Sequence, residues 1–375
     1  MKRIIGITGR TGFIGTHVYN VLSLQPDKYE LVDIKQTHWE NIDQLSELIN
    51  NCDAVLHLAA VNRHTNDKFV YDENVRLAEL LMNALNNVKH PIQLIFSSSL
   101  QENTDTTYGK AKKKSRELFE KWSTDTGNNF WGCIIPNVFG PFGKPFYNSF
   151  VATFCYQLAN QADPQIQTDA AVPLLYVGDL VTEFVKMLDS PMGSPYHEIP
   201  ASKVMKVSDV LSRLNCFRDE YLKKSIIPEL QDNFDIQLFN TFRSYIPHEK
   251  LFPKTYVEHS DNRGAFVELI RLGMGGQVSF STTLPGITRG NHFHTRKIER
   301  FSVIKGKAKM ELRRYGSSEV HTFYLDGDNP SYVDIPIWHY HNITNIGEDV
   351  LYTIFWISEQ YNPEDADTYF ENQNQ

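Results

Sequence analysis

Three histidines and one glutamate near the end of the chain have the spacing of metal ligands. The stretch GNHFHTRKIERFSVIKG, residues 290–306, places His292 and His294 two positions apart, and Glu299 follows five residues later. On a β-strand, side chains at i and i+2 point to the same face, so the two imidazoles project together. His341 lies on a later strand-like segment, IPIWHYHNITN. Together these groups suit Zn²⁺ or another divalent first-row metal, although each alone is more often an ordinary polar residue.

A second set of residues can carry proton transfer. In FSSSLQENTDTTYGKAK, residues 96–112, Tyr108 and Lys112 are four apart and share one face of a helix. An ammonium beside a phenol lowers the phenol's pKa, which makes the tyrosine a proton donor or acceptor for a carbonyl/alcohol pair. Ser99, at the end of the preceding strand, can hold the same oxygen. The alternative is an amphipathic helix with a surface tyrosine and lysine.

A glycine-rich turn near the start of the chain predicts a dinucleotide site. TGRTGFIG, residues 8–15, follows a strand and opens a helical pattern, so its glycines let the backbone approach a pyrophosphate at the helix N-terminus. VLHLAA, residues 55–60, is a strand that ends in small residues and can line the same cleft. The predicted cofactor contacts are Gly9, Arg10, Thr11, Gly12, Phe13, Ile14, Gly15, Leu58, Ala59 and Ala60.

The residues after the second strand bear on the choice of cofactor. Asp33 stands where an acid holds the ribose 2′-hydroxyl of NAD. Lys35 and Arg10 are near it in the sequence and can meet a 2′-phosphate instead. We therefore favour NADPH over NADH.

Two kinds of secondary structure position these residues. Over about 190 residues, short apolar runs such as QLIFSSS alternate with helical patterns such as ENVRLAELLMNALNNV, which predicts a doubly wound parallel sheet of the α/β Rossmann-like type. After Tyr245, closely spaced strand patterns without helices predict an all-β jelly roll. We place the boundary in SYIPHEKLFP, which gives domains at 1–245 and 253–375.

Composition narrows the class of protein. A chain of 375 residues suits two domains, and a net charge of −8 argues against a nucleic-acid partner. No apolar run is long enough to span a membrane. The four cysteines are scattered, without a C-x-x-C pair, which favours reduced thiols. We expect a cytoplasmic protein.

The N-terminal motifs resemble the extended short-chain dehydrogenase/reductase (SDR) family, in its branch that modifies nucleotide sugars. The resemblance implies that Ser99, Tyr108 and Lys112 are the catalytic trio and that Asn74 in ENVRLAELL is the family's helix asparagine. One position departs from the family, because Ile134 stands where an arginine often precedes the PNVFGP segment. Another cation must then recognise the substrate diphosphate.

The C-terminal motifs resemble the two motifs of the cupin family. Gly286, the two histidines, Glu299 and Gly306 have the spacing of the first motif. The second is represented by Pro336, His341 and Asn345, with Trp338 where a glycine is usual. The resemblance implies a cupin jelly roll, but cupins include oxygenases, isomerases, epimerases and binding modules. A metal-free epimerase with a histidine base and a tyrosine acid also stays open.

A 4-keto sugar gives the two domains a common substrate. A ketone acidifies the neighbouring C–H bond, so one domain can epimerise beside it while the other reduces it with a nicotinamide hydride. The whole chain resembles the bifunctional enzymes of bacterial capsular polysaccharide synthesis, in stretches such as NSFVATFCYQLA, LPGITRGNHFH and DADTYF. That resemblance implies C3 epimerisation of UDP-2-acetamido-2,6-dideoxy-hexos-4-ulose and NADPH-dependent reduction at C4. It further implies a product of the UDP-N-acetyl-L-talosamine type, a zinc-bearing cupin and a homodimer.

Two other readings remain open at this point. In the first, the N-terminal domain is a 4-keto sugar reductase and the cupin is only a metal-stabilised dimerisation or binding module. In the second, the chain is a sugar-nucleotide sensor on a retired reductase scaffold. The intact Tyr108–Lys112 pair argues against the sensor, which has no need of a proton donor.

Overall fold

A six-stranded parallel sheet forms the centre of the N-terminal half in the computed structural model, which describes residues 2–262 and 264–371. In spatial order its strands are β2 (Tyr29–Ile34), β1 (Arg3–Thr8), β3 (Ala54–His57), β4 (Gln93–Ser99), β5 (Asn129–Ile135) and β8 (His197–Glu198). Apolar runs such as QLIFSSS in β4 are buried, as expected where both faces of a sheet are covered. The strand order reverses between β1 and β3, and ligands of such sheets bind beyond the carboxyl ends of the strands at this reversal.

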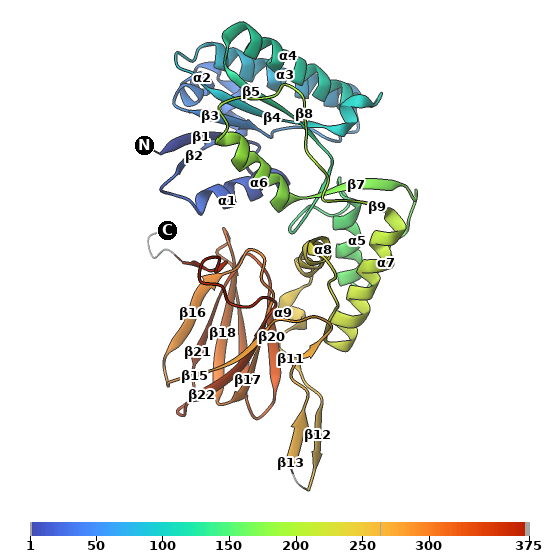
Figure 1. The fold of residues 1–375 in the computed structure, drawn as a ribbon, viewed down its shortest axis with the longest axis vertical. Helices are drawn as coiled ribbons and strands as arrows, with labels where there is room; N and C mark the ends of the chain where they lie inside the picture. The colour runs from blue at the N-terminus through green and yellow to red at the C-terminus, as the bar shows by residue number, and fades with distance from the viewer. Residues whose placement is uncertain (1, 263, 372–375) are drawn as a thin grey trace. The chain divides into compact units, whose positions relative to one another are not determined.

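Helices cover both faces of this sheet (Figure 1). On one face lie α1 (Phe13–Ser23) and α6 (Val177–Leu188), and on the other lie α2 (Ile42–Asn50), α3 (Asp67–Asn86) and α4 (Thr107–Thr126). Each layer of helices encloses its own apolar core against the sheet. The short strands β6 (Asn137–Phe139), β7 (Ala171–Tyr176) and β9 (Lys203–Lys206) form a small second sheet.

Local sequence signals set the ends of α4, the helix that carries Tyr108. The Thr106 side chain caps its N-terminus by accepting a hydrogen bond of 3.1 Å from Gly109 N. Gly127 ends the helix with a φ of +73°, a left-handed conformation that glycine adopts without strain. Between β4 and α4, the 3₁₀ turn η2 (Leu100–Asn103) links the predicted serine to the predicted tyrosine and lysine.

The C-terminal half contains two five-stranded antiparallel sheets. One comprises β11 (Lys254–Thr255), β20 (Ser331–Ile335), β17 (Glu299–Lys305), β22 (Leu351–Ile357) and β15 (Gln277–Thr283). The other comprises β19 (Val320–Asp326), β18 (Lys307–Arg314), β21 (His339–Asn345), β16 (Thr288–Phe293) and β23 (Tyr369–Phe370). Buried and less buried residues alternate along β18 and β21, and side chains of both sheets meet in one apolar core.

Helices and small strands belong to this second half as well. They are α5 (Phe150–Ala159), α7 (Val207–Phe217), the π-helical turn η3 (Arg218–Lys223), α8 (Asn233–Arg243), α9 (His248–Leu251), β10 (Ile226–Ile227), β14 (Arg271–Leu272) and the hairpin β12 (Glu258–Asp261) to β13 (Gly264–Val267). Buried polar groups tie them to the sheet. Tyr221 Oη donates to Asp334 Oδ2 at 2.6 Å, and Asp334 is paired with Arg300 at 2.7 Å. Arg243 Nη2 donates to the Ile335 carbonyl at 2.8 Å.

The chain divides into two compact units. One compact unit comprises residues 1–150 and 169–207, and the other comprises 151–168 and 208–375. The change from helices to strands near residue 245 therefore lies inside the second unit, because η3 and α8 contact its sheet and α7 packs on α8. The predicted limits of the functional domains, 1–245 and 253–375, stay predictions.

The structure confirms the predicted fold class, a doubly wound parallel sheet followed by an all-β region. The runs RIIGITG, ELVDI, AVLHLAA, QLIFSSS and WGCIIP correspond to β1 to β5, and GQVSFSTTL, SYVDIPI and VLYTIFWI correspond to β15, β20 and β22. Within residues 2–262 and 264–371, no helix combines the length and apolar character needed to cross a membrane.

Candidate active site and candidate metal centre

The glycine-rich turn lies directly beyond β1, at the reversal of strand order. Gly9 has a φ of +68°, and a Cβ there would stand 2.7 Å from Ala59 N. A Cβ on Gly15 would stand 2.1 Å from the Gly9 carbonyl oxygen, so this contact requires glycine too. Gly12 precedes the first residue of α1, and no side chain caps that helix N-terminus. The turn therefore presents backbone N–H groups and a helix N-terminus, which suit a pyrophosphate.

Thr8 and His57, which the sequence reasoning missed, hold the segment that follows β3. Thr8 Oγ1 accepts hydrogen bonds from Leu58 N at 3.0 Å and Ala59 N at 3.1 Å, and it lies 2.8 Å from His57 Nδ1. Burial lowers the pKa of His57 to about 3, so its ring is neutral and Nδ1 accepts the threonine proton. Thr8 thus joins the ends of β1 and β3 and sets the position of the predicted contacts Leu58, Ala59 and Ala60.

Two of the predicted cofactor-selecting residues, Arg10 and Asp33, contact each other. Arg10 Nη1 is 3.1 Å from Asp33 Oδ2, and the Arg10 guanidinium stacks 3.6 Å from the centre of the Tyr19 ring. Lys35 is exposed directly after β2. Asp33 is therefore already paired with a cation, and Lys35 follows it two residues later in the sequence.

Tyr108 and Lys112 lie on the same face of α4, as predicted. The Lys112 ammonium is 5.7 Å from the centre of the Tyr108 ring and donates a hydrogen bond of 2.6 Å to the Ser97 carbonyl. Ser99 stands at the end of β4, where its Oγ accepts from Gln101 N at 3.2 Å. The structure thus places a lysine–tyrosine pair beside the strand end that carries the serine run.

The pKa directions differ from the expectation that Lys112 lowers the pKa of Tyr108. Burial lowers the pKa of Lys112 to about 7. Burial, with a smaller effect of Tyr147, raises the pKa of Tyr108 above its ordinary value. The effect of burial on the pKa of Tyr108 is the larger one, because the Lys112 ammonium donates its hydrogen bond to a backbone carbonyl and stands 5.7 Å from the centre of the Tyr108 ring. Tyr108 therefore keeps its proton at neutral pH, as a proton donor must.

A glycine and a buried ion pair, both missed from the sequence, support this site. A Cβ on Gly109 would stand 2.0 Å from the Gln101 carbonyl oxygen, so η2 packs directly on the first turn of α4. Arg116 pairs with Glu102 at 3.0 Å, and Glu102 accepts from Ser98 Oγ at 2.5 Å. These contacts set the distance between the end of β4 and the helix.

Asn74 and Ile134 occupy the positions that the SDR resemblance singled out. Asn74 is buried in α3, donates to the Val61 carbonyl at 2.8 Å and accepts from Val61 N at 3.1 Å. It therefore holds the segment that follows β3. Ile134 is fully buried in β5, so it supplies apolar packing at the position where an arginine is often found.

The predicted metal ligands converge in the second unit. The nitrogen and oxygen ligand atoms of His292, His294, Glu299 and His341 all lie within 4.8 Å of one another. Glu299 Oε2 is 3.1 Å from His294 Nε2 and 3.3 Å from His341 Nε2. These three atoms are buried and lack a well-oriented hydrogen bond within the described part of the chain. Buried polar atoms aimed at a common point, with this donor set, fit Zn²⁺.

The charges of the cluster also suit a metal. Burial lowers the pKa values of His292 and His341, which are therefore neutral. Burial opposes the charged form of His294, but Glu299 outweighs it and raises the pKa of His294. Burial likewise opposes the charged form of Glu299, and the histidines outweigh it and lower its pKa. Glu299 thus favours the protonated form of His294, and a metal that binds there would have to displace this proton.

Trp338 explains the departure from the cupin motif. Its φ is +60°, in the left-handed region where glycine is favoured, so the backbone at this position has a conformation that suits the glycine usual in the motif. Trp338 N donates to the His294 carbonyl at 2.7 Å, and the Trp338 ring stacks on Phe293 at 5.4 Å. Ring packing offsets the strain at this position.

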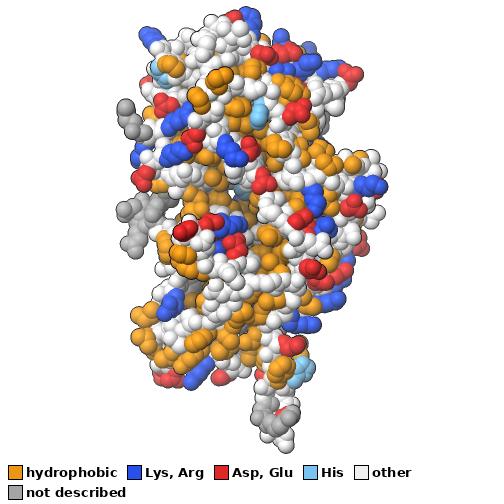
Figure 2. Space-filling view, in the orientation of Figure 1, with side chains coloured by type: hydrophobic (Ala, Val, Ile, Leu, Met, Phe, Trp, Pro, Cys, Tyr) orange, Lys and Arg blue, Asp and Glu red, His pale blue; other side chains and the backbone are white. Residues whose placement is uncertain are grey.

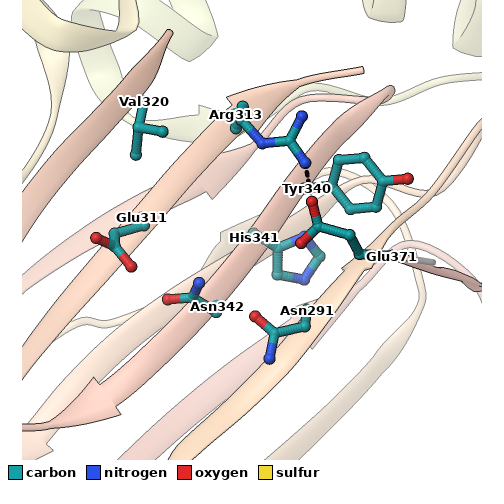
Figure 3. A pocket seen from close by; sticks show the side chains of 8 residues that line it. All are labelled: Asn291, Glu311, Arg313, Val320, Tyr340, His341, Asn342 and Glu371. Carbon is teal, nitrogen blue, oxygen red and sulfur yellow. Dashed lines mark hydrogen bonds and ion pairs between the residues drawn. The ribbon is translucent and has the colours of Figure 1, made fainter. Parts of the chain in front are cut away.

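A pocket of about 120 Å³ has one candidate metal ligand, His341, in its lining (Figure 3). Its lining residues are Asn291, Glu311, Arg313, Val320, Tyr340, His341, Asn342 and Glu371. Arg313 pairs with Glu371, as the dashed line shows. Glu311 and Arg313 flank the buried Leu312, so their side chains lie on the face of the sheet away from the core.

The glycine turn, the parallel sheet and the tyrosine–lysine pair define a nicotinamide-dependent dehydrogenase or epimerase scaffold. The NAD dependent epimerase/dehydratase family matches residues 5–199, and the polysaccharide biosynthesis C-terminal domain matches residues 259–369. The chain belongs to the NAD dependent epimerase/dehydratase family and carries this second domain after it.

Relatives of the same length share both parts. A UDP-2-acetamido-2,6-beta-L-arabino-hexul-4-ose reductase from Pseudomonas aeruginosa is 31% identical over 367 residues, which cover 97% of each chain. The capsular polysaccharide assembling protein CapF from Staphylococcus aureus is 29% identical, with a TM-score of 0.63 over 98% of this chain and 99% of that chain. A structure of CapF with the inhibitor 3-isopropenyl-tropolone gives 28% identity and a TM-score of 0.58 over the same shares. The resemblance to capsular polysaccharide enzymes is thereby confirmed.

Proposed function

We propose that this chain is a bifunctional nucleotide-sugar enzyme. Its cupin domain epimerises C3 of UDP-2-acetamido-2,6-dideoxy-hexos-4-ulose, and its SDR domain reduces the C4 ketone with NADPH. The product is a 6-deoxy sugar of the UDP-N-acetyl-L-talosamine type, on the route to UDP-N-acetyl-L-fucosamine for a surface polysaccharide. The names of the Pseudomonas and Staphylococcus relatives support this substrate class.

The pair formed by Tyr108 and Lys112 is the observation that carries the reductase proposal. Reduction adds a hydride from the nicotinamide to the carbonyl carbon and a proton to the carbonyl oxygen. Tyr108 gives that proton, because burial raises its pKa and keeps the phenol protonated. Ser99 holds the same oxygen from the end of β4. The Lys112 ammonium, 5.7 Å from the ring centre, stabilises the phenolate until solvent returns its proton.

The surroundings of Asp33 support NADPH. A free carboxylate at this position binds the ribose 2′-hydroxyl of NADH and repels a 2′-phosphate. Here Arg10 neutralises Asp33 at 3.1 Å and stacks on Tyr19, which presents its guanidinium as a flat cationic surface. With the exposed Lys35, it offers two cations to the 2′-phosphate.

The histidine–glutamate cluster supports the epimerase step. Removal of the C3 proton beside a ketone, and its return from the opposite face, inverts that carbon without any redox change. A Zn²⁺ ion held by the four ligands supplies Lewis acidity to the ketone oxygen. His292 is the half-buried ligand, and the exposed Phe370 ring lies 5.7 Å from it, so substrate approaches on this side. Tropolone oxygens chelate divalent metals, and a tropolone inhibits the Staphylococcus relative.

Hydrogen exchange in D₂O tests the epimerase step. The full chain is incubated with the 4-keto sugar nucleotide, with and without added Zn²⁺, in the absence of NADPH. We expect deuterium at C3, detected by NMR, and loss of exchange in His341→Ala. If C3 takes up no deuterium, although the chain oxidises NADPH in a separate assay with the same substrate, the epimerase claim fails. The cupin is then only a metal-stabilised dimerisation or binding module.

A tyrosine variant tests the reductase step. In Tyr108→Phe the proton donor is lost, so we expect kcat for NADPH oxidation to fall by about 10²-fold or more. C3 exchange should continue, which separates the two activities. Tyr324→Phe, at an exposed position of the second unit, is the control. Unchanged NADPH oxidation in Tyr108→Phe would refute the assignment of Tyr108.

A homodimer in the cytoplasm is part of the proposal. Figure 2 shows hydrophobic side chains on the visible face of the β-rich unit, and exposed apolar residues of this unit include Val278, Phe280 and Leu284. The first two lie on β15, an edge strand whose backbone can pair with another chain. Sedimentation equilibrium should give twice the chain mass, and Phe280→Lys should shift it toward the monomer.

A further inference from the structure

The last described residues of the chain run along β16, the strand that carries His292 and ends directly before His294. We name residues 366–371 the C-terminal strap. Within it, β23 pairs antiparallel with β16, so that Phe370 is opposite His292 and Tyr369 is opposite Phe293. Glu371 N donates to the Asn291 carbonyl at 3.0 Å. The strap therefore forms one side of the cluster without supplying a ligand.

Asp367 contacts a ligand imidazole directly. His294 Nδ1 lies 2.5 Å from the Asp367 carbonyl oxygen. A carbonyl only accepts, so Nδ1 keeps its proton, and Nε2 is the nitrogen whose lone pair becomes available when His294 is neutral. That nitrogen faces Glu299 and the centre of the cluster. The contact thus selects the tautomer that can bind a metal and sets the rotation of the ring.

The Asp367 side chain holds the turn that follows this ligand. Its carboxylate accepts from Thr295 N and Arg296 N at 3.0 Å, from Lys297 N at 3.2 Å and from Thr295 Oγ1 at 2.6 Å. The residue is 5% exposed, so these bonds are shielded from water. Since the turn leads from His294 toward Glu299, one buried carboxylate sets the spacing between two ligands.

A second contact ties the strap to the same turn. Lys297 Nζ donates to the Ala366 carbonyl at 2.6 Å, and the Lys297 side chain is buried. The Asp367 backbone, with a φ of +41°, lies in the left-handed region that non-glycine residues rarely adopt. Such a conformation persists where surrounding bonds hold it, as these do.

We propose that Asp367 is the positioning residue of the metal centre and that the strap sets the affinity and coordination geometry of the metal. The inference rests on the proposed zinc site. Removal of the carboxylate frees the turn, lets the His294 ring rotate and leaves buried N–H groups unpaired. Loss of such outer contacts weakens metal affinity by about 10- to 100-fold.

Direct metal binding tests this inference without relying on catalysis. The full chain is stripped with a chelator, and Zn²⁺ affinity is measured by competition with a chromophoric chelator. Co²⁺ is then bound, and its visible absorption reports the coordination geometry. For Asp367→Asn we expect a dissociation constant about 10- to 100-fold higher, faster loss of metal to chelator and an altered Co²⁺ spectrum.

Asp365→Asn is the matched control. It makes the same chemical change two residues away, at an exposed carboxylate that pairs with the Arg296 side chain at 2.8 Å. We expect wild-type affinity and spectrum. If Asp367→Asn fails to fold, Thr295→Val removes only the 2.6 Å hydroxyl bond and should raise the dissociation constant several-fold.

The outcomes separate two failures. If the wild-type chain binds neither Zn²⁺ nor Co²⁺, the proposed metal site is wrong. If wild type binds metal, and both Asp367→Asn and Thr295→Val match it in affinity and spectrum, the role of Asp367 is wrong while the metal site stands.

Discussion

The ammonium of Lys112 donates its hydrogen bond to the backbone carbonyl of Ser97, 2.6 Å away, rather than to a side chain of opposite charge. A buried cation without a countercharge is costly, and burial lowers the pKa of Lys112 to about 7. The proton of this amine is therefore linked to the stability of the fold.

The first prediction concerns this linkage. The pKa of Lys112 is lowered from 10.5 to about 7 in the folded state, so between these values the unfolded chain binds more protons. The free energy of unfolding therefore gains about 1.4 kcal/mol per pH unit at most from this group as pH rises. Lys112→Met lacks this gain, so its stability relative to wild type should be greatest below pH 7 and decline toward pH 10. Urea denaturation across this range measures it, with the exposed Lys113→Met as control. A constant difference would contradict the prediction.

The second prediction concerns the contact between η2 and α4. Gly109→Ala places a methyl group 2.0 Å from the Gln101 carbonyl, a backbone atom that can move only with the turn. We expect a loss of about 1–3 kcal/mol in unfolding free energy and a lower kcat for NADPH oxidation, because Tyr108 shifts relative to Ser99. Gly275→Ala, where a Cβ meets nothing within 4 Å, should change neither quantity. Wild-type kcat in Gly109→Ala would show that this packing does not position the tyrosine.

The third prediction concerns cofactor choice. Arg10→Ala removes one of two cations for the 2′-phosphate and frees Asp33, 3.1 Å away, to bind a 2′-hydroxyl. The ratio of kcat/KM for NADPH to that for NADH should fall by about 10-fold or more, which corresponds to one lost charged hydrogen bond. Arg10→Ala with Asp33→Ala should weaken NADPH binding without the gain in NADH use. An unchanged ratio in the single variant means that other residues select the cofactor.

The fourth prediction concerns the stability of a glycine variant and an alanine variant at Trp338. Alanine is ordinarily more favourable than glycine, but the left-handed backbone of Trp338 strains any residue with a Cβ. Both Trp338→Ala and Trp338→Gly lose the stacking on Phe293. We therefore expect Trp338→Gly to be more stable than Trp338→Ala by about 1 kcal/mol in urea denaturation. Greater stability of the alanine variant would mean that the backbone relaxes out of this conformation.

The fifth prediction concerns protons at the metal centre. Glu299 raises the pKa of His294 despite its burial, whereas burial lowers the pKa of His292 and of His341. A proton held by His294 has to leave when Zn²⁺ binds, so binding should release protons and the affinity should weaken as pH falls. Calorimetry in buffers of different ionisation enthalpy measures the release. Glu299→Gln removes the charge that holds a proton on His294, so the number of protons released on Zn²⁺ binding should fall. If the binding enthalpy is the same in every buffer, no proton is released and the prediction is wrong.

Local spacing was enough to predict much of the site. The i, i+2 spacing of His292 and His294 on a strand and the i, i+4 spacing of Tyr108 and Lys112 on a helix depend only on backbone periodicity. The glycine turn after β1 depends on local steric limits in the same way. The predicted ligands therefore converge and the predicted pair shares a helix face.

Burial and distant partners were decided by the tertiary structure. The pKa of Tyr108 is raised rather than lowered, because packing around the phenol outweighs the nearby ammonium. Gly109 matters only because η2 folds back onto it. The helix α8 and the turn η3, which follows α7, join the second unit because Arg243 and Tyr221 find partners on its sheet.

The amino-acid sequence by itself determined the element types, the cofactor turn and the identity of the candidate metal ligands. Each of these depends on local spacing, except that His341 lies on a later strand than the other three ligands. Only the tertiary structure decided what surrounds them. Asp367 meets His294 from 73 residues away. No local pattern marks such a partner, because it is chosen by how two distant segments pack and by which buried N–H groups then need an acceptor.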